Sequence, residues 1–538
     1  TPTVENEGDA AYSWTIDDEV VSTERVFEHA FSEEGRVYVT LRVENRAGYD
    51  EKEARIDVNR LAPPIISLIV PPTGLYVLTG REYTFAPEVQ NGENARYEWY
   101  LDDSSVPVST QKDYIFMRTR PGDCTLRLTA ANEDGTAEKT LAVHVVDVIP
   151  VRIAFIPSSY SADPLVRSVS LGRTLFLRPQ VADAVGPEYT WYVDGTLQEG
   201  ATDRMFAFTP EKEGEYKVTF RVTDTDESPL APLSRHITRA SSKRITEETL
   251  RVTCYERESE RVITTTGQPA ADRVLEFLPA PGQFVNETDM AGYTGQKTFE
   301  EARLYAENRL KKGEFVSLGN FGGYVILAFD HSVENKGGYD FSIPGNQFEG
   351  SNEPGVVWVM QDVNGNGKPD DEWYELRGSE TGNEWTTQEY AVTYYRPGGP
   401  RQGVKWTDNL NRSGQVAYLE QFHPQDYYYP LWLEEESHTY YGTGLRQNTT
   451  QDPGGDWSNN SFEWGYVDNA GSDNLDSSGK TGKTYFKIAN AMTPDGQPAG
   501  LRYIDFIKVQ SAVNGSAGGL GELSTEVAGM AVDENLNR

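Results

Sequence analysis

The sequence is poor in the residues that cross-link or anchor a protein. It has two cysteines, Cys124 and Cys254, in 538 residues. Each occupies an apolar position of a predicted strand, and the two strands belong to different modules, so we expect two buried single thiols and no disulfide. No run of 18 apolar residues occurs, which excludes a transmembrane helix.

The usual patterns of a catalytic site are missing as well. The sequence contains no Gly-x-Ser-x-Gly elbow, no His-Glu-x-x-His pair and no phosphate-binding glycine loop. Its six histidines do not pair at the spacing of metal ligands. Carboxylates are so numerous that no Asp or Glu pair stands out as a glycosidase site. We therefore expect a protein that is not an enzyme.

Basic residues are in deficit. Lys and Arg number 49 against 83 Asp and Glu, which gives a formal net charge of −34. A field of this sign repels phosphate backbones and anionic lipid surfaces, so binding of nucleic acid or of a membrane surface is not expected. The acidity suits calcium binding, and it is also compatible with a role in solubility alone.

Turn-forming and strand-forming residues are abundant, with 49 Gly, 29 Pro and 30 Tyr. This composition favours strands joined by many turns. The length exceeds what one hydrophobic core usually serves, so we expect several domains. The chain starts at Thr1 without Met and reaches its first predicted strand at Tyr12. We expect that a signal segment, and the start of the first module, have been removed.

An internal repeat dominates the sequence before residue 260. The motif Tyr-x-Trp-x-x-Asp occurs at Tyr12–Asp17, Tyr97–Asp102 and Tyr189–Asp194. A glycine follows each Trp after 21 or 23 residues and opens an alternating segment, at Gly35–Val43, Gly122–Ala130 and Gly214–Val222. Even steps from the glycine are apolar, which predicts a strand with one face in a core and one in water.

The repeats are spaced as separate β-sandwiches. Their Trp residues lie 85 and 92 residues apart, which matches one sandwich of two antiparallel sheets per repeat, with the Trp between the sheets and the Asp turning the chain. Junctions at Ala62-Pro63-Pro64 and Ile149-Pro150 indicate short, stiff links. We therefore predict modules at residues 1–60, 61–148 and 149–257. They resemble PKD-like (polycystic-kidney-disease-type) modules of immunoglobulin fold, a resemblance that implies a spacer or adhesion role, although only the third copy has Asp194-Gly195.

Residues 258–538 form a larger predicted domain, in which the repeat no longer occurs and a helix is predicted beside the strands. One helix is predicted from Thr298 to Lys312, with Thr298 and Glu301 as a capping box and Gly313 as the stop. Strands are predicted at Tyr324–Phe329, Val356–Met360, Glu389–Tyr395 and Leu501–Val509. The alternation of the last strand slips at Tyr503-Ile504, so its faces cannot be assigned. We predict an all-β chain: tandem immunoglobulin-like sandwiches followed by a jelly-roll-type β-sandwich with one packed helix.

A loop between two of these strands has the pattern of a calcium site. Oxygen-bearing side chains at alternate positions, with a glycine at the sixth, let a tight loop wrap a hard cation. The predicted ligands are Asp362, Asn364, Asn366, Lys368 through its carbonyl, Asp370 and Asp371. The pattern resembles EF-hand-like loops, although Trp373 stands at the twelfth position, where those loops place Glu. The alternative is a polar hairpin turn of the Asn-Gly type without metal.

Aromatic residues crowd the same domain, and seven of the ten Trp lie between residues 358 and 464. Trp358, inside an apolar strand, is expected in the core. Aromatics on loops rich in Gly, Asn and Asp offer flat faces to a large amphipathic ligand or a sugar ring. The residues predicted to bind such a ligand are Trp373, Trp406, Tyr428, Trp432, Trp457, Trp464, Tyr466, Asp468 and Asn469. The alternative is that these rings fill the core of a large sandwich.

Several segments of this domain resemble a family of surface lipoproteins of Gram-negative bacteria. They are Gly323–Asp330, Asn352–Val359, Asp362–Glu375, Phe462–Asn469 and Ser524–Val527. The resemblance to BtuH-type cobamide-binding lipoproteins implies capture of a cobamide (vitamin B12) for an outer-membrane transporter. It also implies a cell-surface location through an N-terminal lipid anchor that is absent from this chain. Neither composition nor spacing indicates a cobamide, and a glycan would suit the same aromatic loops.

Three functions from different classes therefore stay open. The first is capture of a nutrient such as a cobamide, with calcium as a structural ion and the sandwiches as spacers. The second is binding of carbohydrate or adhesion to glycans. The third is a structural or partner-binding surface protein whose aromatic rings are buried.

Overall fold

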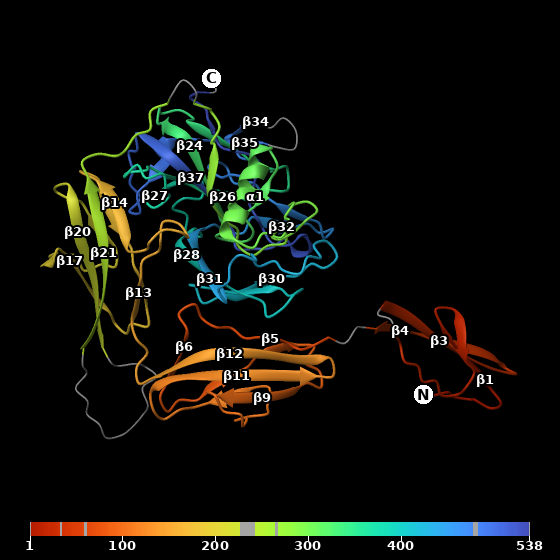
Figure 1. Cartoon of the computed structure of the whole chain (residues 1–538). Coiled ribbons are helices and arrows are strands. Elements are labelled where there is room, and N and C mark those ends of the chain that lie inside the picture. The colour runs from red at the N-terminus through yellow and green to blue at the C-terminus, as the bar shows by residue number, and fades with distance from the viewer. Residues whose placement is uncertain are drawn as a thin grey trace. The chain divides into compact units, whose positions relative to one another are not determined.

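The computed structural model describes residues 2–32, 35–58, 62–225, 243–263, 267–476 and 482–536. Across these residues the chain is nearly all β, with one α-helix (Figure 1). It divides into two compact units: Thr1–Ile66, Phe85–Tyr114 and Thr125–Leu141 form one, and Ser67–Thr84, Ile115–Cys124 and Ala142–Arg538 form the other. No described sheet combines strands from two of the four predicted domain ranges. The boundaries of those ranges stay predictions.

The first module is a single antiparallel sheet in the order β2-β1-β3-β4. Its strands are β1 (Ala11–Ile16), β2 (Glu19–Ser22), β3 (Gly35–Asn45) and β4 (Gly48–Val58). Trp14 is half-buried here, and its Nε1 donates to the carbonyl of Glu24 at 2.9 Å. Because the described part of this module has one sheet only, the ring lies on that sheet rather than between two sheets.

The second module has eight short or medium strands. They are β5 (Ile65–Ser67), β6 (Leu75–Leu78), β7 (Tyr83–Phe85), β8 (Glu88–Gln90), β9 (Arg96–Leu101), β10 (Tyr114–Phe116), β11 (Gly122–Asn132) and β12 (Gly135–Val146). β9 pairs with β11 antiparallel, and β6 pairs with β12 in parallel. Trp99 is completely buried, as the sandwich prediction requires.

The third module is a sandwich of the same kind. Its strands are β13 (Arg152–Ala154), β14 (Val166–Ser170), β15 (Leu175–Leu177), β16 (Gln180–Ala182), β17 (Glu188–Val193), β18 (Thr196–Leu197), β19 (Phe206–Phe208), β20 (Gly214–Thr225) and β21 (Lys243–Tyr255). The main sheet has the order β14-β21-β20-β17-β18, and β15-β19 and β13-β16 form two smaller sheets. Trp191 is buried in the core between them with Phe208 and Val218.

The aspartate of each repeat has a defined structural role. Asp17, Asp102 and Asp194 adopt positive φ angles of 45°, 51° and 48°. Their Oδ1 atoms accept the backbone N–H of Tyr38, Thr125 and Lys217 at 3.1, 3.0 and 2.9 Å. Each of these N–H groups lies three residues after the glycine that opens the long strand. The motif therefore turns the chain after the Trp strand and ties the turn to its neighbour, because Asp tolerates the left-handed region better than most residues.

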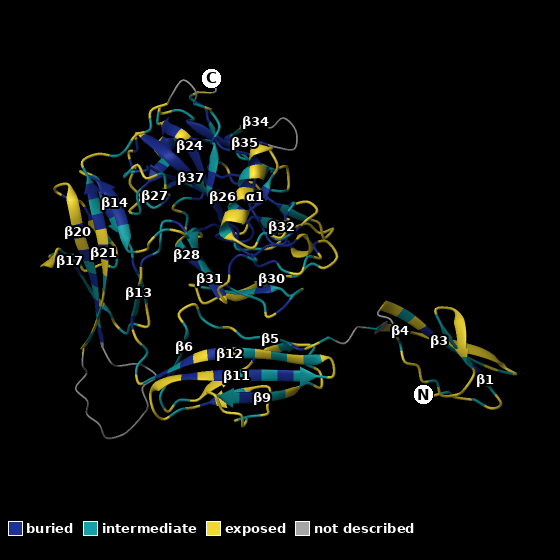
Figure 2. Ribbon diagram, viewed as in Figure 1, coloured by how far each residue is buried: buried dark blue, intermediate teal, exposed yellow. Residues whose placement is uncertain are grey.

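The C-terminal domain is built on a six-stranded sheet in the order β22-β24-β37-β26-β27-β36. These strands are β22 (Arg273–Leu278), β24 (Tyr324–Glu334), β37 (Tyr503–Ser511), β26 (Gly355–Met360), β27 (Trp373–Leu376) and β36 (Ala491–Met492). Every pairing between them is antiparallel. Most residues of β26 and β37 are buried (Figure 2).

Two further four-stranded sheets accompany this central sheet. One has the order β30-β29-β28-β31, with β28 (Thr387–Tyr395), β29 (Val404–Asp408), β30 (Ser413–Val416) and β31 (Ser437–Gly444). The other has the order β34-β35-β25-β39, with β25 (Phe341–Pro344), β34 (Asn474–Asp476), β35 (Lys483–Phe486) and β39 (Val532–Asp533). Short pairs join β23 (Val316–Ser317) to β38 (Glu526–Val527) and β32 (Thr449–Gln451) to β33 (Trp457–Asn459).

The central sheet has a hydrophobic core on each face. On one face Ile326, Met360 and Phe506 pack against the Tyr-rich sheet of β28 and β31. On the other face a second core joins the sheet to α1 and to β25 and β35. The predicted β-sandwich with one packed helix is therefore confirmed. It consists of more than two layers, because the central sheet is covered on both faces.

The helix and the last long strand follow from their sequences. α1 (Phe299–Lys311) has the predicted capping box of Thr298 and Glu301, and Gly313 ends it with a φ of 73°. β37 has no solvent face because it lies between β24 and β26 with a core on both sides. The register of its pairing with β24 shifts between Ile504 and Phe506. This irregularity accounts for the slip in the apolar alternation of the β37 sequence.

Two predictions made from absences can be compared with the structure. Cys124 and Cys254 are both buried single thiols, as expected. Within the described ranges, no helix has the length and hydropathy needed to cross a membrane.

Candidate functional site

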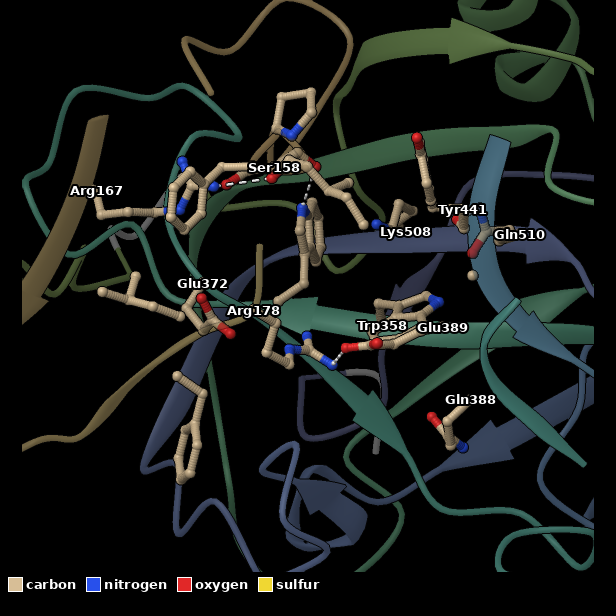
Figure 3. A pocket seen from close by; sticks show the side chains of 17 residues that line it. Ser158, Arg167, Arg178, Trp358, Glu372, Gln388, Glu389, Tyr441, Lys508 and Gln510 are labelled. Carbon is tan, nitrogen blue, oxygen red and sulfur yellow. Dashed lines mark hydrogen bonds and ion pairs between the residues drawn. The ribbon is translucent and has the colours of Figure 1, made fainter. Parts of the chain in front are cut away.

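A pocket of about 140 Å³ opens where the third module meets the C-terminal domain (Figure 3). Both parts belong to the same compact unit. The third module contributes Phe155–Ser158, Arg167 and Phe176–Arg178. The C-terminal domain contributes Trp358, Glu372, Trp373, Gln388, Glu389, Tyr441, Gly442, Lys508 and Gln510.

The floor of the pocket is one face of the central sheet. Trp358 on β26 lies directly opposite Lys508 on β37 and opposite Glu375 on β27. Because successive side chains of a strand point to opposite faces, Trp358, Lys508 and Gln510 emerge on the face that also carries Met360 and Phe506. The apolar core of this face thus ends in a polar and aromatic patch.

Lys508 is enclosed by aromatic rings. Its Nζ lies 4.7 Å from the ring centre of Trp373, 5.1 Å from that of Trp358 and 5.8 Å from that of Tyr324. Burial lowers the pKa of Lys508 to about 8, and the nearby carboxylates of Glu276 and Glu372 oppose that shift. No described residue accepts a hydrogen bond from Nζ, so this ammonium group is held by cation–π contacts together with the attraction of the carboxylates.

Two buried polar atoms of the pocket residues have no hydrogen-bond partner among the described residues. They are Nε1 of Trp358 and Oε1 of Gln510. The amide nitrogen of Gln510 donates to the carbonyls of Gly322 and Tyr441, both at 2.9 Å, and this fixes the orientation of Oε1. Gly442 leaves room for it, since a Cβ there would lie 2.4 Å from Oε1. Two residues of the pocket lining therefore each hold a buried polar atom whose desolvation is not offset by a hydrogen bond within the described residues.

The third module is fixed to this floor by specific contacts. Nε1 of Trp373 donates to the carbonyl of Ser158 at 2.8 Å. Arg178 lies 3.5 Å from the carboxylate of Glu389, which also receives Arg204. Arg167, buried in the third module, donates to the carbonyl of Ile156 at 2.8 Å and so holds the wall formed by residues 155–158.

The predicted calcium loop joins β26 to β27 and so connects the two tryptophans of the pocket. The Asp362 carboxylate accepts the N–H groups of Asn366 and Gly367 at 3.0 and 2.8 Å. Asn364 Oδ1 accepts the N–H of Asn366, and Asn366 Oδ1 accepts the N–H of Lys368. The oxygens at the first, third and fifth positions thus all turn into the loop, as a cation site requires.

Asp370 and Asp371, two further predicted ligands, accept hydrogen bonds from within the loop. Both oxygens of Asp370 accept from the Asn366 amide, and Asp371 Oδ2 accepts the N–H of Val363 at 2.7 Å. Burial raises the pKa of Asp371 to about 7 and also raises the pKa of Asp362. The Lys368 side chain is exposed, which leaves its carbonyl as the predicted donor. The carboxylates of Asp362, Asp370 and Asp371 do not form a group whose oxygens all lie within 4.8 Å of one another, and calcium at this loop stays a prediction.

The predicted ligand-binding aromatics do not gather on one surface, and several are not exposed. Trp432 is 2% exposed, in the core beside Phe277 and Tyr293. Tyr428 and Tyr466 are also buried, with their hydroxyls bonded to backbone groups. The expectation that these rings face solvent is therefore corrected: they fill the space between sheets and loops, which a domain of this size needs aromatic volume to do.

The other predicted aromatics are partly accessible. Trp406 is half-buried and packs on the core beside Gly414, Trp457 is half-buried against Gly518, and Trp464 is half-buried in its loop. Trp373, although 8% exposed, is the predicted ring that lines the pocket. Asp468 and Asn469 are buried; Asn469 clamps both backbone groups of Phe462 at 2.7 and 2.9 Å.

Sequence analysis missed most of the pocket. Trp358 was expected in the core, and it does contact two cores, but it is half-buried and lines the cavity. Lys508 and Gln510 carried a detectable signal, because they are polar interruptions in an otherwise apolar strand. Ser158, Arg167 and Arg178 carried none, since their contribution depends on how the third module packs on the C-terminal domain.

Comparison with known proteins identifies the N-terminal modules. Residues 1–45 and 63–132 match the family described as PKD-like domain. The chain is 28% identical over 182 residues to the highly immunogenic outer capsid protein of Enterobacteria phage T4, covering 32% of this chain and 47% of that protein. It is 22% identical over 217 residues to human polycystin-1, covering 40% of this chain and 5% of that protein.

Among solved structures, the chain is similar to the three N-terminal domains of the bacteriophage RB49 Hoc protein. That similarity has a TM-score of 0.20 and 14% identity, and it covers 46% of this chain and 88% of the other. The chain spans less than half the length of each of these two curated relatives. Residues 1–45 and 63–132 are therefore PKD-like domains of immunoglobulin-like fold, a type typical of extracellular and surface proteins.

Proposed function

We propose that this protein is a non-catalytic cell-surface binding protein, and that its ligand enters the pocket between the third module and the C-terminal domain. The observation that carries the proposal is a cavity with aromatic walls, two of whose lining residues, Trp358 and Gln510, each hold a buried polar atom without a hydrogen-bond partner among the described residues. A pocket with aromatic walls and a few convergent polar groups is the usual form of a small-molecule site.

The size and charge of the pocket limit what can enter it. At about 140 Å³ it is smaller than a typical site for a drug-sized ligand, which spans roughly 300–1,000 Å³. Its lining carries three cations, Lys508, Arg167 and Arg178, and two carboxylates, Glu372 and Glu389, of which Glu389 is paired with Arg178. We infer an uncharged group that can both accept and donate hydrogen bonds, such as a sugar residue or a primary amide.

Both ligands considered from the sequence present such a group. A corrinoid is edged with amides, and one amide arm could occupy the pocket while the macrocycle stays outside. The resemblance to cobamide-binding lipoproteins favours this ligand, together with an outer-membrane transporter as partner and a lipid anchor at the cell surface. A glycan would place a single sugar residue on Trp358 or Trp373, and the PKD-like modules suit adhesion to such a surface.

Two titrations of the full chain separate these ligands. Isothermal titration with cyanocobalamin tests the cobamide, and a glycan array tests carbohydrate. Saturable binding of either ligand is expected to weaken about ten-fold in Trp358→Phe, which keeps a ring but removes the N–H donor. Trp457→Phe, a half-buried Trp outside the pocket, is the matched control and is expected to leave affinity unchanged.

Two results would overturn the proposal. One is the absence of binding to both ligand classes by the wild type. The other is the reverse ranking of variants, in which Trp457→Phe weakens binding and Trp358→Phe does not. That ranking would move the site to the aromatic loops of residues 449–464.

A further inference from the structure

Three carboxylates from distant segments meet inside the C-terminal domain, away from the pocket and from the loop of residues 362–371. They belong to Glu353, Asp468 and Glu526, and one oxygen of each lies within 4.8 Å of the others. Asp468 and Glu526 are 1% and 2% exposed, and Glu353 is half-buried. The cluster is thus an interior feature with one side toward solvent.

The backbone holds the three side chains together. The N–H of Glu353 donates to the carbonyl of Asp468 at 3.0 Å, and the N–H of Glu526 donates to Asp468 Oδ2 at 2.9 Å. Ser524 donates its hydroxyl to Glu526 Oε1 at 2.7 Å. Asp468 adopts a φ of 56°, in the left-handed region that Asp tolerates better than most residues. The chain is therefore positioned to bring like charges together.

No basic side chain among the described residues compensates for these charges. No ion pair links Glu353, Asp468 or Glu526 to a Lys, Arg or His among the described residues, and the further charge that acts on Glu353 is another carboxylate, Glu522. Asp468 Oδ1 is buried and has no hydrogen-bond partner there. Buried carboxylates are normally paired with a cation or coordinate a metal ion, because an isolated buried charge costs several kcal/mol.

We propose that Glu353, Asp468 and Glu526 are the protein ligands of one calcium ion, with Asp468 Oδ1 as a central donor. The donor set consists of oxygen alone, which favours a hard cation over zinc, copper or iron. Calcium suits it better than magnesium, because calcium accepts irregular coordination whereas magnesium demands an octahedron and retains its waters. The ion would tie the segment around Asp468 to β38 and to the start of β26, three parts of the chain that are far apart in sequence.

Counting bound calcium in four proteins tests this site separately from the loop. The full chain is stripped with a chelator, equilibrated with calcium, dialysed and analysed for metal by mass spectrometry. The four proteins are the wild type, the loop variant Asp362→Asn/Asp371→Asn, the cluster variant Asp468→Asn and the combination. We expect two equivalents of calcium per chain in the wild type, one in the loop variant, one in the cluster variant and none in the combination. If the loop of residues 362–371 binds no calcium, we expect one equivalent in the wild type and in the loop variant, and none in the cluster variant and the combination. The cluster can therefore be tested even if the loop does not bind calcium.

A second measurement covers the case in which Asp468→Asn does not fold. Glu353→Gln keeps the side-chain volume at the half-buried position, and we expect it to weaken calcium binding at least ten-fold in the loop variant. Calcium should also raise the melting temperature of the stripped loop variant by about 3 °C or more. Equal calcium content with and without Asp468→Asn would overturn the proposal. The proposal would also be overturned if calcium did not change the melting temperature of the stripped loop variant, because the carboxylates would then be neutralised by protons.

Discussion

At the scale of single residues, the modules depend on an aspartate that does two things. Asp17, Asp102 and Asp194 place the chain in the left-handed region and cap an N–H of the neighbouring strand. Sequence analysis assigned these residues to a turn, which is correct, but it had no means of identifying the N–H they accept. That partner lies 21 to 23 residues away, and only the register of the sheet brings it close.

Replacing Asp194 with Ala should destabilise the edge of the third module. The substitution removes the bond to Lys217 and leaves an alanine at positive φ, a combined cost of about 2 kcal/mol. Amide hydrogen exchange of β20 in the full chain should therefore speed up about ten- to thirty-fold. Asp203→Ala, an exposed aspartate of the same module, should leave that exchange unchanged. Equal protection in both variants would contradict the role given to Asp194.

Glu375 predicts a pH dependence that can be isolated with one substitution. Burial raises its pKa from 4.5 to about 7, and a hydrogen bond from Thr443 opposes the shift. The folded state therefore binds more protons than the unfolded state between these values, so the wild type loses stability as pH rises from about 4.5 to about 7. Glu375→Gln has no such proton and should gain in melting temperature relative to the wild type across this window. A difference that stays flat with pH would show that Glu375 is ionised in the fold.

At the scale of elements, sequence patterns predicted correctly those helix ends and strands that depend on residues close together in the chain. The capping box at Thr298, the stop at Gly313 and the alternating strands of the repeats all rest on residues within a few positions of each other. β37 shows the limit of this approach: it is buried on both faces, so no two-residue period marks a core side. The aromatic loops show another limit, because composition alone does not distinguish a ring displayed on a loop from one that fills a core, as Trp432 does.

The loop between β26 and β27 should couple cation binding to ligand binding. It connects the strand of Trp358 to the strand of Trp373, so loosening it would displace two walls of the pocket. Chelation of calcium, or Asp362→Asn, should lower ligand affinity about ten-fold, measured by the same titrations. Glu349→Gln, which changes an exposed acid of this domain, is the control. Unchanged affinity in Asp362→Asn would separate the loop from the pocket.

At the scale of the whole molecule, the third module differs from a simple spacer. Tyr160 stacks on Phe299 at 4.4 Å, its N–H donates to Glu276 at 2.7 Å, and its hydroxyl donates to Glu435 at 2.7 Å. Arg173 adds a bond to the carbonyl of Ala499 at 2.8 Å. These contacts join the module to the C-terminal domain, which the sequence did not indicate because the repeat pattern treats the three modules alike.

Tyr160→Ala should loosen this junction without unfolding either side. Calorimetry of the full chain should then show the transition of the third module separating from that of the C-terminal domain, and ligand affinity should fall. Tyr192→Ala removes a ring whose contact with Arg221 is internal to the third module and serves as the control. If Tyr160→Ala leaves both the calorimetric profile and the affinity as they are, the pocket does not depend on the junction.

The shared construction of the pocket has a consequence for how such proteins diversify. Its floor belongs to a sheet with a hydrophobic core on each face, whereas its opposite wall belongs to a small sandwich with its own core. Exchanging that sandwich for another would change what the cavity accepts while leaving the folding of the larger partner intact. Specificity in this architecture can therefore change by recombination of whole modules, without the gradual remodelling of a densely packed interior.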